Sequence, residues 1–492
     1  MKLSKLVNAN EYIRLSGDLQ CEISTVTTDV ECKTENALLI IIKDDTVTNI
    51  MDWDRRFSAI ICTEEIFEEL FGKCNVTLVA VESPRRAWAM TESRIRAIDY
   101  SKMKFVAVTG TNGKSTTARM IQAMLGAEGA KTGFIGTGAI ESLGIRISDT
   151  FYSMTTPDPN ILYEAIRRME DDAVEYIVME VSSHALHFEK TAAIPFEISL
   201  FTNISPEHLD FHNTIEDYTK TKLKLLQQSK LVIMNIDDHR LRSVYENITT
   251  PKRSFGILWD SECKATDLKD NGFDGFRFIY READFSFLAK SSLVGKFNIY
   301  NALGSLSAAI AIGVPPCIAK SALSSFKGIK GRVECVYDEK IRAIIDYAHS
   351  EEAFRALLSS IRTYTQNDLI VLFGCGGERY RGKRATMGHI AQSYANLTYL
   401  TADNPRGEPL TRIFDDVISG FDNNCNYILI PDRAEAIRRA ILDAKDGDTI
   451  LLVGKGAEEY NIDASGYHSF SERETLLSAI EEREALRGES RA

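Results

Sequence analysis

The stretch FVAVTGTNGKSTT, from Phe105 to Thr117, decides the fold of this chain. Its first four residues are continuously apolar, as expected for a buried parallel strand, and residues 115–128 have the pattern of a helix. The glycine loop 110–115 joins the two. Because glycines let backbone N–H groups turn toward phosphate oxygens, and a helix N-terminus adds partial positive charge, this order predicts a phosphate-binding site.

The residues of this loop have distinct expected roles. Lys114 is expected to contact the β- and γ-phosphates of ATP, and Ser115 to reach Mg²⁺. The common pattern has a further glycine where this chain has Val108, so the motif here is the shorter Gly-x-x-Gly-Lys-Ser. A glycine turn before an ordinary helix is the alternative, which the lysine and hydroxyl at the helix start disfavour. The candidate nucleotide-binding residues of the loop are Gly110, Thr111, Asn112, Gly113, Lys114, Ser115 and Thr116.

The composition is that of an ordinary globular protein, with 44% hydrophobic and 26% charged residues. A net charge of −12 argues against a nucleic-acid partner, and the absence of any Cys-x-x-Cys pair gives no support to a zinc ribbon. The N-terminal segment lacks the apolar core of a signal peptide, and no apolar run reaches about 18 residues. We therefore expect a cytoplasmic protein without a membrane span, and a monomer.

The length of 492 residues predicts about three domains. Short apolar runs alternate with polar stretches over residues 1–103, which indicates a small α/β domain. Buried-strand and helix patterns alternate over 104–331 and again over 332–492, which predicts parallel sheets covered by helices. The expected fold class is α/β with three domains: the small N-terminal one, a central P-loop ATPase-like domain and a C-terminal Rossmann-like domain.

Four more side chains with relevant chemistry lie downstream of the loop. Glu180 ends the apolar run 176–179, where a carboxylate beside a phosphate loop is well placed to hold Mg²⁺; a strand-end residue paired to a neighbour is the alternative. His208 and His212 share a loop, which indicates a site or a solvated loop with incidental histidines. Lys222 lies on a predicted helix, where a lysine alone is usually only solvated.

Together with the phosphate loop, these residues belong to a longer series of motifs that covers the chain from about residue 105 to its end. The further segments are Thr155-Thr156-Pro157, Glu180 to His184, Thr202-Asn203, His208-Leu209-Asp210, Gly295-x-Phe297-Asn298-x-x-Asn301, Gly331-Arg332-Val333-Glu334, Asp346-Tyr347-Ala348-His349 and Asp432-Arg433. In these motifs and in their order the chain resembles the Mur ligase family.

The resemblance implies an enzyme that uses ATP to activate a carboxylate as an acyl phosphate, which an incoming amine then attacks. Positioning and charge neutralisation are the protein's part. Lys114, Ser115, Glu180 and His208 match phosphate or metal ligands of the family. Lys222 matches a lysine that family members carbamylate, which makes it a ligand for a second Mg²⁺. Four positions match nucleotide contacts: Asn301, Arg332, Asp346 and His349.

Within the family, the C-terminal third is similar to the members that add the third amino acid to UDP-N-acetylmuramoyl-L-alanyl-D-glutamate. An Asp-Asn-Pro-Arg stretch, here 403–406, marks meso-diaminopimelate as that amino acid. Its second carboxylate suits a bidentate guanidinium, so Arg406 and Arg379 are the expected clamps, with Glu458 as acceptor for the distal ammonium. The candidate amino-acid site is Arg379, Asp403, Asn404, Arg406, Gly454 and Glu458.

The acceptor end departs from the family pattern. Thr155, Thr156, Ser182 and Lys190 are the candidate contacts to the UDP-muramoyl-dipeptide, but Phe188 and Lys190 stand where relatives have a glutamine and an arginine. The uridine motifs of the N-terminal domain are weak, with only residues 27–30 at the place of the first. Three alternatives follow: a ligase for the usual acceptor, a paralogue acting on a different carboxylate acceptor, or a nucleotide-binding protein without turnover.

Overall fold

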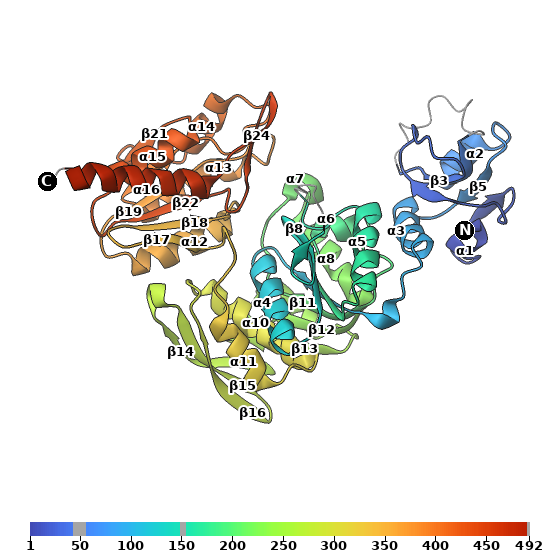
Figure 1. The fold of residues 1–492 in the computed structure, drawn as a ribbon, viewed down its shortest axis with the longest axis horizontal. Coiled ribbons are helices and arrows are strands. Elements are labelled where there is room, and N and C mark those ends of the chain that lie inside the picture. Colours follow the sequence, from blue (N-terminus) through green and yellow to red (C-terminus); the bar gives the residue numbers. More distant parts are fainter. Residues whose placement is uncertain (43–55, 148–153, 490–492) are drawn as a thin grey trace.

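The computed structural model describes residues 1–42, 56–147 and 154–489. Three bodies follow one another along the chain, each built on its own sheet (Figure 1). We call them the N-terminal, central and C-terminal domains. Each combines a sheet containing parallel strands with packed helices, which confirms the predicted α/β class.

The N-terminal domain has a five-stranded sheet in the order β1-β5-β4-β3-β2, parallel except for the β1–β5 pair. Short apolar runs, which the sequence shows over residues 1–103, form its three central strands. Apolar clusters cover both faces. Its elements are β1 (Arg14–Ser16), β2 (Thr25–Thr27), β3 (Ala37–Ile40), β4 (Phe57–Cys62), β5 (Thr77–Ala80), α1 (Leu3–Leu6), α2 (Glu64–Leu70) and α3 (Pro84–Ile95).

The central domain has an eleven-stranded sheet in the order β16-β15-β14-β13-β12-β11-β6-β10-β7-β8-β9. Parallel pairing runs from β7 to β14, as the sequence predicts, whereas both edges end in antiparallel strands that it does not predict. The strands are β6 (Lys104–Thr109), β7 (Thr132–Gly136), β8 (Ala139–Ser142), β9 (Ile145–Arg146), β10 (Tyr176–Glu180), β11 (Phe196–Phe201), β12 (Ser229–Asn235), β13 (Lys252–Gly256), β14 (Cys263–Asp270), β15 (Phe276–Glu282) and β16 (Phe285–Ser291).

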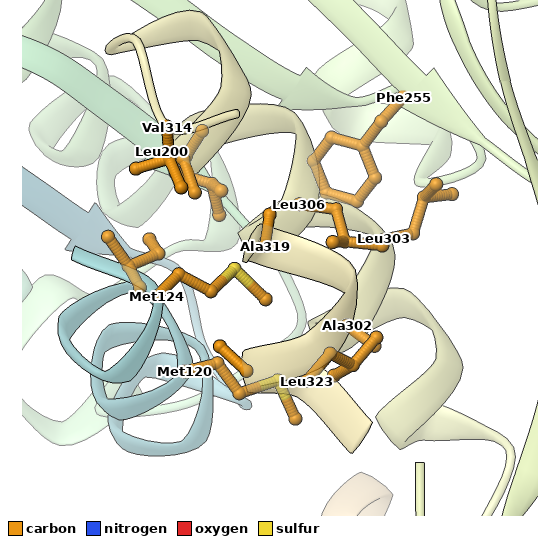
Figure 2. Close-up of a cluster of buried hydrophobic side chains, with 14 of the residues drawn as sticks. Met120, Met124, Leu200, Phe255, Ala302, Leu303, Leu306, Val314, Ala319 and Leu323 are labelled. Atoms are coloured by element: carbon orange, nitrogen blue, oxygen red, sulfur yellow. The ribbon is translucent and has the colours of Figure 1, made fainter. Parts of the chain in front are cut away.

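Helices cover both faces of this sheet. Figure 2 shows one face, where Met120 and Met124 of α4 share a buried apolar cluster with Leu303 and Leu306 of α10 and Leu200 of β11. This packing fixes α4, and therefore the phosphate loop at its start, on the sheet. The helices are α4 (Lys114–Ala127), α5 (Pro159–Asp171), α6 (Ser183–His187), α7 (Leu209–His212), α8 (Ile215–Leu223), α9 (His239–Tyr245), α10 (Phe297–Ala311) and α11 (Pro316–Ser325).

The C-terminal domain has a six-stranded sheet in the order β17-β18-β22-β19-β20-β21, parallel except for the β17–β18 pair, and a separate β23–β24 hairpin. The predicted apolar runs of this region all form strands. Its elements are β17 (Glu334–Asp338), β18 (Arg342–Asp346), β19 (Leu369–Phe373), β20 (Leu397–Leu400), β21 (Tyr427–Leu429), β22 (Thr449–Val453), β23 (Tyr460–Asp463), β24 (Gly466–Ser469), α12 (Glu351–Tyr364), α13 (Lys383–Tyr394), α14 (Leu410–Ile418), α15 (Arg433–Asp443) and α16 (Glu472–Glu489).

Candidate functional site

The predicted phosphate loop joins β6 to α4 in the middle of the central sheet. Gly110 and Gly113 have φ angles of 142° and 84°, which side chains rarely adopt. A Cβ atom on Gly110 would lie 1.9 Å from Thr202 Oγ1, and one on Gly113 would lie 2.3 Å from Asn301 Oδ1. Both glycines are therefore required by conformation and by space, and Asn301 lies directly against the loop.

Side chains at the end of β11 hold the loop in shape. Asn203 Oδ1 accepts a hydrogen bond from Asn112 N at 2.9 Å, and Thr202 Oγ1 donates to Asn112 O at 2.6 Å. Thr111 N donates to Asn203 O at 2.9 Å. Since these partners belong to the protein itself, the backbone of the loop is preorganised.

Two lysines converge on the Gly110 carbonyl. Lys114 Nζ donates to it at 2.9 Å and also to Thr111 O at 2.7 Å, while Lys222 Nζ donates to it at 3.0 Å from α8. Lys222 is buried, and its Nζ lies 4.7 Å from the centroid of the Tyr218 ring. Burial and repulsion from Lys114 hold the pKa of Lys222 well below its ordinary value, which favours a neutral amine.

Glu180 ends β10 beside the loop, because β10 pairs with β6 in parallel and places Glu180 opposite Val108. The carboxylate accepts hydrogen bonds from Ser115 Oγ at 2.9 Å and from Thr137 N at 3.0 Å. A carboxylate and a hydroxyl this close are ligands that Mg²⁺ prefers. The predicted pair of Ser115 and Glu180 is thus assembled, and its donor chemistry fits the ion.

The predicted His208 immediately precedes helix α7. Its backbone is left-handed, with φ 55°, its ring is exposed, and its centroid lies 4.9 Å from that of His184. The neighbouring Glu207 carboxylate lies 3.3 Å from His349 Nε2 of the C-terminal domain. Burial raises the pKa of Glu207, but His349, His208 and Lys114 together hold that pKa well below its usual range.

The C-terminal domain reaches the phosphate loop through two residues that the sequence singles out. Arg332 Nη2 donates to Ser115 Oγ at 3.4 Å, and the Arg332 guanidinium lies 4.4 Å from the centroid of the Tyr347 ring. The second residue is His349, which contacts the Glu207 carboxylate. Asp346 is buried between them, accepting 2.7 Å hydrogen bonds from two backbone N–H groups. Burial raises the pKa of Asp346. Thr116 lies in the first turn of α4.

The predicted amino-acid site lies at the carboxyl ends of β20 and β22. Asn404 Nδ2 donates to Glu458 Oε2 at 3.0 Å, and the fully buried Lys455 donates to Asn404 Oδ1 at 2.9 Å. Asp403 lies against Gly454, where a Cβ atom would come within 2.6 Å of its carboxylate. Burial and then repulsion from Asp403 raise the pKa of Glu458.

The two predicted clamps, Arg406 and Arg379, differ in how firmly hydrogen bonds hold their side chains. Arg406 Nη1 donates to Gly377 O at 3.0 Å and to Asn404 O at 3.1 Å, so its guanidinium is held in place at the site. Arg379 is exposed and donates only to Glu378 O, at 3.2 Å, among the residues that the structure describes. The fully buried Arg384 supports this loop by binding the Gly376 carbonyl at 3.1 Å and two carboxylates.

The four acceptor residues are near one another. Thr156 Oγ1 donates to Glu180 O at 3.0 Å and accepts from Ser182 N at 3.2 Å, and the Ser182 hydroxyl caps α6. Thr155 Oγ1 lies 3.1 Å from Thr137 Oγ1, next to Glu180. Lys190 is buried and bonds Asp158 at 2.8 Å.

Sequence patterns missed several residues of these sites. Lys455 lies between the predicted Gly454 and Glu458, and Tyr218 lies on the same helix as Lys222, but a lysine or tyrosine at such a place gives no signal of its own. Glu207 adjoins His208, and Thr137 follows a glycine after β7; neither pattern indicates a site. Only the fold brings Tyr218, Glu207 and Thr137 to the phosphate-loop site and Lys455 to the amino-acid site.

Residues 1–42, 56–147 and 154–489 contain no group of three or more His, Cys, Asp or Glu side chains arranged to hold a metal ion by themselves. Any Mg²⁺ here would need further oxygen ligands from substrate or water, as is usual for this ion. They also contain no helix long and apolar enough to cross a membrane.

Known proteins resemble this chain along its whole length. The family model of the Mur ligase middle domain matches residues 108–309, and that of the Mur ligase glutamate ligase domain matches 331–456. The UDP-N-acetylmuramoyl-L-alanyl-D-glutamate–2,6-diaminopimelate ligase 1 of Clostridium acetobutylicum is 34% identical over 98% of this chain and 100% of its own length. The ligase of the same name from Clostridioides difficile is 33% identical over 98% and 99%.

Solved structures agree with this. A structure of a UDP-N-acetylmuramoyl-L-alanyl-D-glutamate–2,6-diaminopimelate ligase superposes with a TM-score of 0.68 at 25% identity, covering 98% of this chain and 99% of that one. A MurF structure from Acinetobacter baumannii has a TM-score of 0.63 at 17% identity over 98% of both chains, which shows a shared fold.

Proposed function

This chain belongs to the Mur ligase family of ATP-dependent C–N ligases, and we propose that it joins meso-2,6-diaminopimelate to UDP-N-acetylmuramoyl-L-alanyl-D-glutamate. The amide forms at the D-glutamate carboxylate, by way of an acyl phosphate, in the synthesis of peptidoglycan precursors. The observation that carries this proposal is the full-length similarity to ligases named for this reaction, combined with an assembled phosphate loop and an ordered Arg406.

ATP, when bound, would supply the phosphoryl group that activates the acceptor carboxylate. The backbone N–H groups of loop 110–115 and the N-terminus of α4 would face its phosphates. Lys114 would exchange its bonds to loop carbonyls for phosphate oxygens, which are stronger partners because they are charged. Arg332 lies beside Ser115 and would add a second positive charge. Asn301, Asp346 and His349 would complete the nucleotide site.

Mg²⁺ would bind at Ser115 and Glu180, where it would offset phosphate charge. A second ion would use Lys222 after carbamylation, with His208. The neutral amine of Lys222 would attack CO₂ and lose a proton, so that a negatively charged carbamate replaces the amine. The lowered pKa of Lys222 favours the neutral amine that this reaction needs. Both assignments rest on the donor chemistry and burial of these side chains.

The amino-acid site would recognise the two charged groups on the distal carbon of diaminopimelate, its carboxylate and its ammonium. Arg406 would grip its carboxylate, and Glu458 its ammonium. Asp403, Asn404 and Gly454 would shape the site, and the exposed Arg379 would close on it. L-Lysine lacks the distal carboxylate, so Arg406 would have no partner there.

The UDP-muramoyl-dipeptide would lie near Thr155, Thr156, Ser182 and Lys190. The full-length relatives favour this acceptor over a different one. The retained Lys114, Glu180 and Lys222 favour turnover over nucleotide binding alone. We further propose a monomeric cytoplasmic enzyme with domains 1–103, 104–331 and 332–492, without a nucleic-acid partner.

The test incubates the purified chain with ATP, Mg²⁺ and the UDP-muramoyl-dipeptide, and measures phosphate release and product mass. We expect both to depend on meso-diaminopimelate and to be weak with L-lysine. Lys114→Ala is the inactive control. Release only with another carboxylate acceptor would indicate a paralogue, and no release with any acceptor would indicate a protein that only binds nucleotide.

A further inference from the structure

Lys190 is already neutralised by the protein. Its Nζ lies 2.8 Å from Asp158 Oδ1 and 3.3 Å from Thr156 O, and only 7% of its side chain is exposed. The ammonium therefore offsets the charge of Asp158 and fixes the segment that follows Thr155. A cation committed in this way has little capacity left for a carboxylate of the acceptor.

Another cation lies next to this segment. Arg85 comes from α3 of the N-terminal domain, the helix that lies between that domain and the central one (Figure 1). Its guanidinium carbon is 4.1 Å from the centroid of the Phe188 ring, and the Asp158 carboxylate acts on it electrostatically. Arg85 makes no hydrogen bond or ion pair to any residue that the structure describes, so its N–H groups are available.

The position of Arg85 is fixed by its neighbours. Ser83 caps α3 by accepting a hydrogen bond from Arg86 N at 3.1 Å, and its hydroxyl also bonds the Glu189 carboxylate across the domain boundary. Helix α3 packs against α5. The start of α3 and the segment 188–190 are thus joined, and the Phe188 ring provides a flat surface for the guanidinium.

Helix energetics do not explain an arginine at this place. Arg85 is the second residue of α3, where the helix dipole disfavours a cation and favours an anion. The guanidinium, which has no hydrogen-bond or ion-pair partner among residues 1–42, 56–147 and 154–489, and the positive end of α3 point to the same ligand chemistry, a carboxylate. Phe188 removes an amide from this site, but it adds the surface on which Arg85 lies.

We propose that Arg85 binds the carboxylate of the acceptor's D-glutamate that does not react, an inference that rests on the proposed function. One carboxylate of this D-glutamate joins the incoming amine, and the other stays ionised. Guanidinium binds a carboxylate through two parallel N–H groups, which gives orientation as well as affinity. The N-terminal domain therefore selects the acceptor's dipeptide end, and Phe188 positions Arg85 for this role.

The experiment compares two acceptors: the UDP-muramoyl-dipeptide and its analogue in which the non-reacting carboxylate is an amide. We expect the wild-type chain to prefer the carboxylate in kcat/KM by ~10- to 100-fold, as for a lost charged hydrogen-bonded pair. Arg85→Ala should abolish this preference by raising KM for the natural acceptor only. KM values for ATP and diaminopimelate should not change.

Three variants make the result decisive. Arg86→Ala removes the neighbouring exposed charge and should keep the preference. Arg85→Lys keeps the charge and the stem, so it decides the outcome if Arg85→Ala lowers the melting temperature, and it should retain only part of the preference. Lys190→Ala should affect both acceptors equally.

The outcomes separate this inference from the proposed function. A wild-type chain without activity on the natural acceptor overturns both. Activity with an unchanged preference in both Arg85 variants overturns the role of Arg85 alone. Loss of the preference in Lys190→Ala instead assigns the carboxylate to Lys190 and likewise overturns it.

Discussion

Replacing Arg406 by lysine tests how the chain selects its amino acid. Arg406 has φ 53°, a strained conformation for any side chain, and lysine adopts it at the same cost. The substitution therefore changes the head group and leaves the backbone energy alone. One nitrogen of the guanidinium, Nη1, is occupied by the carbonyls of Gly377 and Asn404.

The expected fall in kcat/KM follows from the two other nitrogens of the Arg406 guanidinium. Nε and Nη2 of Arg406 donate to no residue in the described part of the chain, so they form the fork offered to a carboxylate. A lysine ammonium can keep one carbonyl contact, but it cannot also bind a carboxylate bidentately. The loss of charged hydrogen bonds, about 1.5–3 kcal/mol, predicts a ~10- to 100-fold fall in kcat/KM for diaminopimelate.

The assay measures phosphate release with diaminopimelate and with L-lysine as the amine. Because L-lysine has no second carboxylate, its kcat/KM should change by less than about threefold in Arg406→Lys. The exposed Arg412→Lys, on α14, is the matched control and should leave both substrates unaffected. An equal fall for both amines would refute the clamp and show that Arg406 only supports the Gly377 loop.

Three further predictions concern charged side chains. Lys222→Arg keeps a long basic side chain that cannot form a carbamate, so phosphate release should fall by ~100-fold or more, and the carbamate signal that ¹³C-bicarbonate gives in NMR should disappear; normal turnover without that signal contradicts this. Lys455→Met removes a buried donor to Asn404 and should raise KM for diaminopimelate by ~10-fold, with KM for ATP as the unchanged reference. A hydrogen bond from Arg384 lowers the pKa of the Glu408 carboxylate to about 2. This pair therefore stabilises the fold above the unfolded pKa of ~4.3, and that stabilisation is lost as the pH falls toward about 2. Glu408→Gln should lower the free energy of unfolding, measured in urea, by about 1–2 kcal/mol at pH 7, and this difference should shrink below pH ~4.5. A difference that does not change with pH would assign the lost stability to packing instead of to the ion pair.

The parallel sheets could be predicted because their strands are continuous apolar runs. Residues 177–179 and 369–373, for example, are buried on both faces and lie in β10 and β19. The antiparallel edge strands could not be found in this way. In β15 buried and exposed residues alternate, so no continuous apolar run marks this strand.

The same difference applies to the site. Lys114 and Ser115 could be predicted because a strand, a loop and a helix start place them locally, and Glu180 because it ends a continuous apolar strand. Lys455 could not, since its burial depends on Asn404, 51 residues away in sequence, and a lysine is usually solvated. Arg85 belongs to a different domain from the segment that it contacts, so only the packing of α3 on α5 brings them together.

The shared Gly110 carbonyl explains why the phosphate loop and Lys222 form one electrostatic unit. Two ammonium groups at 2.9 and 3.0 Å from the same oxygen repel each other where water does not screen them. Lys114 would relieve this by binding phosphate, whereas burial and the nearby Lys114 lower the pKa of Lys222 and so favour loss of its proton. A neutral amine is the form that reacts with CO₂, and the resulting carbamate would attract both Lys114 and Mg²⁺. If Lys222 is carbamylated as proposed, the position of Lys114 in the short glycine motif would favour the modification of a lysine more than 100 residues away.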